Sequence, residues 1–336
     1  MIVRVAEPPV TVEVRRRPDA EEERRELLAA LLAHPRSIPS KHFYDERGLA
    51  LFDEITTLHE YYPTRTERAI LERVAPEVAR TTGAAELVEL GSGSATKTRL
   101  LLDALHARGT LRLYVPVDVN EASLARVGDE LVRDYPGLRV HGVAADFLGP
   151  LAPLPVLDDL LDDQAEPRLA IFLGGTLGNL RPADEAPAFL ARLRAALAPG
   201  DWFLLGVDLV KDAATLEAAY DDAKGVTAEF NRNVLRVVNR VLRADFDPAR
   251  FRHRAFYDTS NDWIEMRLVA AGAQTVRFGT SGDTIDLLDG EEIRTEISAK
   301  YTRERAEALL YRAGFAPCQW HADEHGWFGV SLARAV

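Results

Sequence analysis

Cysteine is almost absent from this chain, since Cys318 is the only one among 336 residues. A single thiol cannot close an intramolecular disulfide, and few cysteines are typical of proteins in reducing compartments. The segment Met1–Arg4 also lacks the apolar stretch that a secretory signal peptide would carry. These absences predict a cytoplasmic protein, and we expect it to be a monomer.

Long apolar runs and an excess of positive charge are also missing. No stretch approaches the ~20 apolar residues that a membrane span needs. The 41 basic and 53 acidic residues give a net charge of −12, which disfavours binding to polyanions. The eight histidines do not cluster with cysteine at zinc-binding spacings. We therefore expect no membrane, nucleic-acid or metal partner.

Short apolar segments alternate with amphipathic helical segments between residues 69 and 212. Hydrophobic residues make up 47% of the chain, enough for a substantial core. Continuous apolar runs are typical of strands buried on both faces of a parallel sheet. Strands are predicted at Leu87–Leu90, Leu111–Val117, Leu138–Ala144, Leu169–Leu173 and Trp202–Val207. This alternation predicts an α/β fold with a doubly wound, Rossmann-like sheet.

The pattern changes after residue 212, where two helical segments precede short strands with hairpin-like turns. A helix and two strand-like segments then close the chain. We predict a core of residues 69–212 plus 301–336. Residues 9–68 plus 213–300 would form a second, discontinuous α+β domain that binds substrate.

A glycine turn, E-L-G-S-G at residues 89–93, follows the first predicted core strand. Glycines let a ligand approach the backbone closely, and the helix that follows presents free N–H groups. A dinucleotide site would add a third glycine at G-x-G-x-x-G, but this turn continues to Ala95 and Thr96. The missing glycine favours S-adenosylmethionine as the cofactor over a dinucleotide, and an ordinary strand–helix turn is the alternative.

Acidic residues follow the next two predicted strands. Asp118 can accept hydrogen bonds from both hydroxyls of a ribose. It could instead cap the following helix, although Asn120 suits that position better. Asp146 can accept from an adenine amino group while Phe147 packs against the base, but this pair alone is also typical of a turn. The series therefore predicts a nucleoside-type cofactor.

Polar residues also follow the fourth predicted strand. Ligands of open α/β sheets lie beyond the carboxyl ends of the strands, so Thr176 and Asn179 are candidates for contact with the substrate. The alternative is a loop asparagine that only pairs with nearby backbone groups.

The glycine turn and six further motifs together make this sequence resemble the histidine Nα-methyltransferase family, which makes N,N,N-trimethylhistidine (hercynine) for ergothioneine biosynthesis. The similarity spans residues 37–332. Besides the glycine turn, it rests on K-H-F-Y-D at 41–45, E-Y-Y-P-T-R-T-E at 60–67, G-N-L at 178–180, D-L-V-K-D at 208–212, F-N-R-N at 230–233 and T-E-I-S at 295–298.

The resemblance implies a class I methyltransferase core, S-adenosyl-L-methionine as cofactor and L-histidine as substrate. It implies cofactor contacts at Gly91, Gly93, Lys97, Asp118, Asp146 and Phe147. It implies substrate contacts at Tyr61, Asn179, Tyr220, Met266, Glu296 and Ser298, with the last two holding the imidazole. Tyr44 and Thr176 match positions near the reacting amine, where Tyr44 or water would take the amine's proton.

Three alternatives stay open at this point. Another aromatic amino acid, such as tryptophan, could be the substrate, although Glu296 and Met266 together favour histidine. An NAD(P)-dependent oxidoreductase would need the missing third glycine. A non-catalytic binding module would be expected to lose the substrate-side residues. For Glu296 and Ser298 themselves, simple alternation on an exposed strand face is the competing interpretation.

Overall fold

The computed structural model describes residues 8–15, 20–93, 95–146 and 166–336. Its larger part is an eight-stranded sheet with the order β1-β4-β3-β2-β5-β6-β13-β12. The first six of these strands run parallel, and β13 and β12 add an antiparallel hairpin at the end. The strands are β1 (Val10–Val14), β2 (Glu86–Leu90), β3 (Leu113–Asp118), β4 (Arg139–Ala144), β5 (Arg168–Phe172), β6 (Trp202–Asp208), β12 (Phe315–Ala322) and β13 (Phe328–Ala335).

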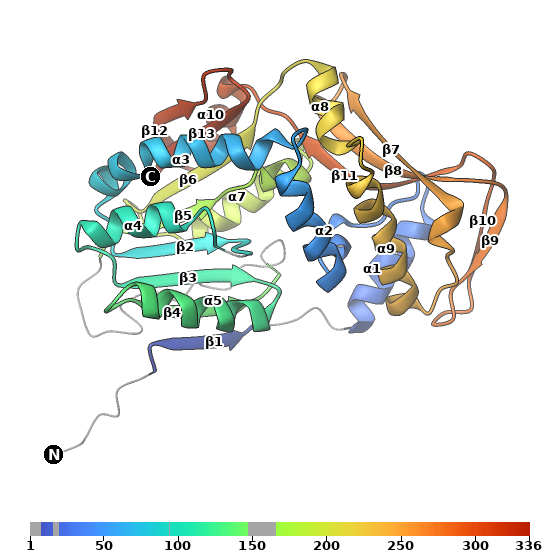
Figure 1. Ribbon diagram of the computed structural model, residues 1–336, viewed down its shortest axis with the longest axis horizontal. Helices are drawn as coiled ribbons and strands as arrows, with labels where there is room; N and C mark the ends of the chain where they lie inside the picture. The colour runs from blue at the N-terminus through green and yellow to red at the C-terminus, as the bar shows by residue number, and fades with distance from the viewer. Residues whose placement is uncertain (1–7, 16–19, 94, 147–165) are drawn as a thin grey trace.

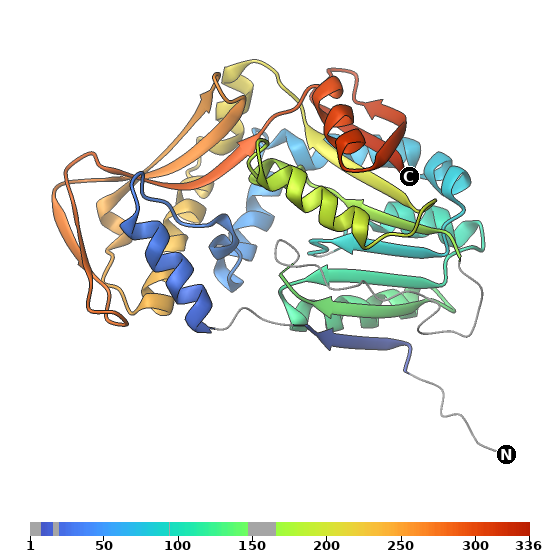
Figure 2. The same cartoon turned by 180° about the vertical axis from the view of Figure 1, so that it is seen from behind.

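Helices cover both faces of this sheet (Figures 1 and 2). One hydrophobic core joins the sheet to α7 (Glu185–Ala195) and α10 (Arg303–Arg312). A second joins the opposite face to α3 (Tyr62–Thr82), α4 (Arg99–Ala107) and α5 (Glu121–Asp134). Strand residues alternate between the two cores, as a pleated sheet requires. The predicted α/β, doubly wound architecture is confirmed.

A smaller unit lies beside the carboxyl ends of the parallel strands (Figure 1). Its three-stranded antiparallel sheet has the order β11-β8-β7, and β9 and β10 form a separate hairpin. The strands are β7 (Phe251–Asp258), β8 (Trp263–Ala270), β9 (Gln274–Arg277), β10 (Thr284–Leu287) and β11 (Glu292–Ala299). The helices are α1 (Ala20–Leu32), α2 (Glu46–Thr57), α8 (Ala213–Tyr220) and α9 (Val226–Leu242), with short 3₁₀ helices η1 (Ser40–Phe43) and η3 (Pro248–Arg250).

The amino-terminal strand corrects one predicted boundary. Residues 9–68 were expected in the second domain, but Val10–Val14 pair in parallel with β4 at the edge of the large sheet. A Cβ on Gly128 of α5 would lie 2.8 Å from Val10, so the glycine gives the valine its place against the helix. The strand Val10–Val14 thus covers the otherwise open edge at β4, although the two strands are far apart in the sequence.

Helix α3 begins at Tyr62, seven residues before the predicted start of the core at residue 69. Pro63 occupies its first turn, where a missing backbone N–H costs nothing. The helix packs against β6, β12 and β13 of the large sheet. Residues 62–68 therefore extend from the core toward the second unit, and α3 carries side chains to the place where the two meet.

Among the described residues, no helix is both long and apolar enough to cross a membrane. The expectations of a monomer and of no nucleic-acid partner stay predictions.

Candidate functional site

The chain reverses its direction of progress across the sheet between β2 and β5, because β3 and β4 lie on one side and β5 and β6 on the other. Such a switch point leaves a crevice beyond the carboxyl ends of the strands, where open α/β sheets bind ligands. The glycine turn leaves β2 at this crevice. Gly91 and Gly93 have φ angles of 72° and 49°, a region that favours glycine.

Gly91 and Gly93 are exposed, and apart from the chain neighbours of Gly93 no described atom lies within 4 Å of the position of a Cβ on this glycine. Its backbone is tied to β3: the N–H of Gly91 donates to the carbonyl of Val117 at 2.8 Å, and that of Gly93 donates to Asp118 Oδ2 at 3.0 Å. Asn120, not Asp118, caps α5 by accepting from the N–H of Ser123. The Asp118 carboxylate thus lies beside an open glycine turn, an arrangement that fits a ribose.

Asp146 lies two residues beyond the carboxyl end of β4, on the same side of the sheet as the glycine turn and Asp118. Phe147 lies outside the described residues. The glycine turn, Asp118 and Asp146 therefore follow the three adjacent strands β2, β3 and β4.

Lys97 lies after the glycine turn and pairs with Glu67 of α3. Glu67 is fully buried and also accepts from the N–H of Gly174 at 2.8 Å. A Cβ at Gly206 would lie 2.1 Å from the Glu67 carboxylate, so any larger residue there would displace the carboxylate from this position. No role for Glu67 was predicted from the sequence. Its place in the E-Y-Y-P-T-R-T-E motif was the only signal, and the contact shows that it orients Lys97 and the loop after β5.

Glu89 of the glycine-turn motif also has an unpredicted environment. It is buried, and it accepts from Thr98 at 2.6 Å and from the phenol of Tyr114. Burial raises the pKa of this carboxyl to about 7, although the two hydrogen bonds oppose the shift. These contacts bind β2 and β3 to the start of α4 beneath the turn.

Thr176 and Asn179 lie in η2 (Thr176–Asn179), directly after β5. The Thr176 hydroxyl donates to the carbonyl of Leu173 at 2.9 Å, which leaves its oxygen lone pairs as acceptors. The Asn179 side chain forms a hydrogen bond with Glu296 of β11. An ionised carboxylate only accepts, so Asn179 donates through its NH₂ group and its amide oxygen remains an acceptor.

Glu296 lies next to an irregularity in the pairing of β11 with β8, between Arg294 and Glu296. The bulged Thr295 is buried, and its hydroxyl lies 2.7 Å from Asn231 Oδ1. Bulges redirect neighbouring side chains, and this one is held by the F-N-R-N motif of α9. Buried Met266 lies opposite Glu296 on β8. Burial raises the pKa of Glu296 to about 7, opposed by Lys300 and by the Asn179 hydrogen bond.

The aromatic residues predicted for the site gather at the same place. Tyr61 packs edge-on against Tyr220 with ring centroids 6.4 Å apart. Phe52 joins Tyr44 and Tyr61 at 6.0 and 6.1 Å. Burial raises the pKa of all three tyrosines above the usual value, and the charge of Glu296 adds to each shift. The phenols therefore stay protonated at neutral pH, and they surround the Glu296 carboxylate.

A chain of hydrogen bonds from β11 holds the backbone of Tyr220 in place. Asn231 accepts from Thr295 through its oxygen, so its NH₂ group donates to His253 Nδ1 at 2.8 Å. The opposite nitrogen of His253 then donates to the backbone carbonyl of Tyr220 at 2.8 Å. No sequence signal pointed to His253, which fixes the end of α8 relative to the three-stranded sheet.

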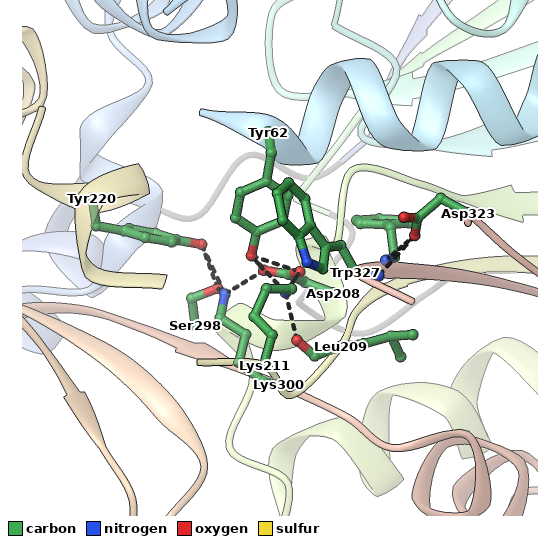
Figure 3. Close-up of polar contacts among 10 residues, drawn as sticks. Tyr62, Asp208, Leu209, Lys211, Tyr220, Ser298, Lys300, Asp323 and Trp327 are labelled. Carbon is green, nitrogen blue, oxygen red and sulfur yellow. Dashed lines mark hydrogen bonds and ion pairs between the residues drawn. The ribbon is translucent and has the colours of Figure 1, made fainter. Parts of the chain in front are cut away.

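A buried charged network that sequence analysis also missed lies where the chain crosses between the two units (Figure 3). Asp208, at the end of β6, bonds Lys211 at 2.7 Å and Lys300 at 2.8 Å. The phenol of Tyr62 donates to the same carboxylate. The backbone of Tyr301 pairs with those of Asp208 and Val210, so the two crossing segments are joined like short strands. The D-L-V-K-D motif therefore anchors the junction.

No group of histidine, cysteine and carboxylate side chains in the described part of the chain could hold a metal ion. A surface hollow of about 430 Å³ lies over α10 and β12. None of the predicted site residues lines it, so it is separate from the crevice.

A family model described as "Histidine-specific methyltransferase, SAM-dependent" matches residues 23–335. The chain is 47% identical over 310 residues to a histidine N-alpha-methyltransferase of Mycobacterium tuberculosis, covering 92% of this chain and 94% of that protein. It is 32% identical to ergothioneine biosynthesis protein 1 of Neurospora crassa, covering 89% of this chain and 34% of that one.

The chain is also 29% identical to an L-tryptophan methyltransferase of Psilocybe serbica, covering 93% and 92% of the two chains. Among solved structures, it resembles 1,6-didemethyltoxoflavin-N1-methyltransferase of Burkholderia thailandensis with a TM-score of 0.45 and 14% identity, over 91% and 93% of the chains. This TM-score is too low to support an argument about the fold, so the fold assignment rests on the strand order of the large sheet.

Proposed function

The chain belongs to the histidine-specific, SAM-dependent methyltransferase family, and we propose that it trimethylates the α-amino group of L-histidine to hercynine, the first step of ergothioneine biosynthesis. One observation carries this proposal: Asn179, which follows β5 at the carboxyl ends of the parallel strands, forms a hydrogen bond with Glu296 of the second unit. A reacting amine and an imidazole would thereby be held by linked residues.

S-adenosylmethionine, when bound, supplies an electrophilic methyl group. The open glycine turn, Asp118 and Lys97 fit its binding, because they offer exposed glycines that a ligand can approach closely, a ribose acceptor and a cation at the carboxyl ends of the strands. The remaining task of the protein is to hold the amine in line with that methyl group, and such positioning can contribute about 7–11 kcal/mol.

The amine must be unprotonated before each transfer. Desolvation among the aromatic side chains favours the neutral form. The oxygens of Thr176 and Asn179 are both acceptors, so they would bind the N–H groups of the neutral primary and monomethylated amines and direct the lone pair toward the methyl group. The dimethylated amine has no N–H left, so the walls of the site would position it for the third transfer. The raised pKa of Tyr44 argues against this residue as the base and leaves water to accept the proton. Tyr44 then acts as a wall of the site.

Two polar side chains, Glu296 and Ser298, stand on the same face of β11. An imidazole has two ring nitrogens to pair with them, whereas an indole has one. This difference favours histidine over tryptophan, since an unpaired buried polar group costs about 1–3 kcal/mol.

The direct test incubates the protein with S-adenosylmethionine and each amino acid in turn, with mass spectrometry as the readout. We expect histidine to gain one, two and then three methyl groups, at least about tenfold faster than tryptophan. Failure to methylate histidine would refute the proposal, and preferential methylation of tryptophan would replace the substrate.

Gly178 allows η2 to approach β11. A Cβ there would lie 2.8 Å from the carbonyl oxygen of Ala299 and 3.1 Å from its nitrogen. Backbone atoms cannot move aside easily, so we expect Gly178→Ala to displace Asn179 from Glu296. Because a displacement of ~1 Å can lower a rate by up to ~10²-fold, kcat/KM for histidine should fall by about tenfold or more.

Calorimetric titration with S-adenosylmethionine serves as the control for Gly178→Ala. The dissociation constant should change by less than about twofold, because the substitution acts between η2 and β11 and not on the glycine turn or Asp118. An unchanged kcat/KM would show that the approach of η2 to β11 does not position the amine.

A further inference from the structure

Lys300 is a buried cation with every proton of its ammonium group engaged. It is 2% exposed, and its Nζ lies 2.8 Å from Asp208 Oδ2, 2.8 Å from Ser298 Oγ and 3.0 Å from the Tyr220 oxygen (Figure 3). An ammonium can only donate. Ser298 and Tyr220 are therefore both acceptors toward Lys300.

The hydrogen of Tyr220 then has a defined direction. Its oxygen lies 2.7 Å from Ser298 Oγ. A phenol is a stronger hydrogen-bond donor and a weaker acceptor than an aliphatic alcohol, so Tyr220 donates and Ser298 accepts. Ser298 Oγ thus receives two hydrogen bonds, which occupy both of its lone pairs. Its own hydrogen must point away from Lys300 and Tyr220.

We propose that Lys300 and Tyr220 make Ser298 an obligate donor, so that the site binds the neutral imidazole of histidine in one tautomer. This inference rests on the proposed function. The ring N–H would donate to Glu296, and the nitrogen that bears the lone pair would accept from Ser298. An imidazolium has two N–H groups and would find no acceptor at Ser298. Lys300 is a positioning residue, because it acts through Ser298.

The charges around the ring do not override this choice. Glu296 and Asp208 contribute two carboxylates, and Lys300 and Lys211 contribute two ammonium groups. Three further titratable groups feel the charge of Glu296, the phenols of Tyr44, Tyr61 and Tyr220, and these are uncharged. Because the pKa of Glu296 is raised to about 7, this set is neutral when Glu296 is ionised and carries one net positive charge when Glu296 is protonated. Neither state favours an added proton on the ring, so the direction of the hydrogen bonds decides its protonation state.

Nuclear magnetic resonance of ring-¹⁵N-labelled histidine tests the inference directly, because its ¹⁵N shifts separate a protonated nitrogen from one with a lone pair. The ligand is bound in the presence of S-adenosylhomocysteine, which cannot donate a methyl group, and spectra are recorded from pH 5.5 to 8. We expect one nitrogen of each kind down to at least about one pH unit below the imidazole pKa of ~6.5. Two protonated nitrogens at pH 6 would overturn the proposal.

Tyr220→Phe removes one donor and returns a lone pair to Ser298. We expect the bound ring to become protonated at pH 6 in this variant, with the pKa of the bound ring raised by about one unit or more relative to wild type. Lys300→Met should act in the same direction. An unchanged ¹⁵N pattern in Tyr220→Phe would refute the role assigned to the two donors.

Tyr301→Phe is the matched control. Tyr301 is buried next to Lys300, and its hydroxyl has no hydrogen-bond partner among the described residues. Its removal should leave the spectra of bound histidine unchanged, and a change there equal to that of Tyr220→Phe would count against the proposal. If wild type binds no labelled histidine, the proposed function fails, whereas bound imidazolium contradicts only the inference about Ser298.

Discussion

Replacing Glu296 with alanine is expected to raise the KM for histidine by roughly 10- to 150-fold. A hydrogen bond to a charged group contributes about 1.5–3 kcal/mol, and each 1.4 kcal/mol is a factor of ten. The variant would leave an imidazole N–H without an acceptor in a site lined by aromatic side chains. It would also release Asn179, so we expect kcat to fall as well.

The cofactor provides the internal comparison for this variant. Glu296 lies on β11 in the second unit, away from the glycine turn, so the dissociation constant of S-adenosylmethionine should change by less than about threefold. Steady-state kinetics and calorimetric titration measure the two quantities on the same preparation. An unchanged KM for histidine would remove Glu296 from the substrate site and favour a purely structural role on the strand.

Glu292→Ala is the matched variant, since Glu292 is a carboxylate on the same strand. It pairs with Arg254 at 2.6 Å and with Arg267 at 2.5 Å, not with Asn179. Partly exposed ion pairs contribute about 1 kcal/mol or less, so this change should lower stability slightly and leave the KM for histidine within about twofold. Equal effects of the two alanine variants would point to general damage to β11.

The second large effect is expected at Asp118. Asp118→Ala should weaken the binding of S-adenosylmethionine by roughly 100-fold or more, because two charge-assisted hydrogen bonds to the ribose would be lost at about 1.5–3 kcal/mol each. The same change removes the acceptor for the N–H of Gly93 at 3.0 Å, which would loosen the glycine turn. Asp118→Asn keeps an acceptor oxygen and should lose less affinity than Asp118→Ala.

Asn120→Ala separates binding of the cofactor from capping of α5. Asn120 accepts from the N–H of Ser123, and loss of such a cap costs about 1 kcal/mol of stability. We expect its dissociation constant for S-adenosylmethionine to stay within about threefold of wild type, with the midpoint of unfolding lowered. If both alanine variants lost affinity equally, the order of the turn, and not the Asp118 carboxylate, would determine binding.

The strands and helices that carry the cofactor edge follow from local sequence. Apolar runs of four to seven residues between amphipathic segments predict buried parallel strands, and the predicted strand at Leu169–Leu173 agrees with β5 within one residue. The glycine turn and Asp118 could also be placed, because both directly follow such runs. Thr176 and Asn179 follow the fourth run and could be placed in the same way. The other residues on the substrate side came from the family resemblance, and the roles of all of them are proposals.

Other features could not be inferred from the sequence, because they depend on contacts between distant segments. Nothing in the sequence of Val10–Val14 indicates that it pairs with β4, so this strand was wrongly assigned to the second domain. Helix α3 begins in a segment rich in aromatic and polar residues, which hides the helical period at its start. Glu67 gains its partner only when α3 reaches the loop after β5, and His253 gains its partner only when β7 reaches α8.

The sequence by itself therefore determined the α/β core, the glycine turn and the acidic residues after the strands, since these depend on the order of residues within single elements. Only the tertiary structure decided that Asp208, Lys211 and Lys300 form one buried network with Ser298. The segments that carry these charges are about ninety residues apart in the chain. Their charges tolerate burial because each finds an opposite charge and a complete set of hydrogen bonds there.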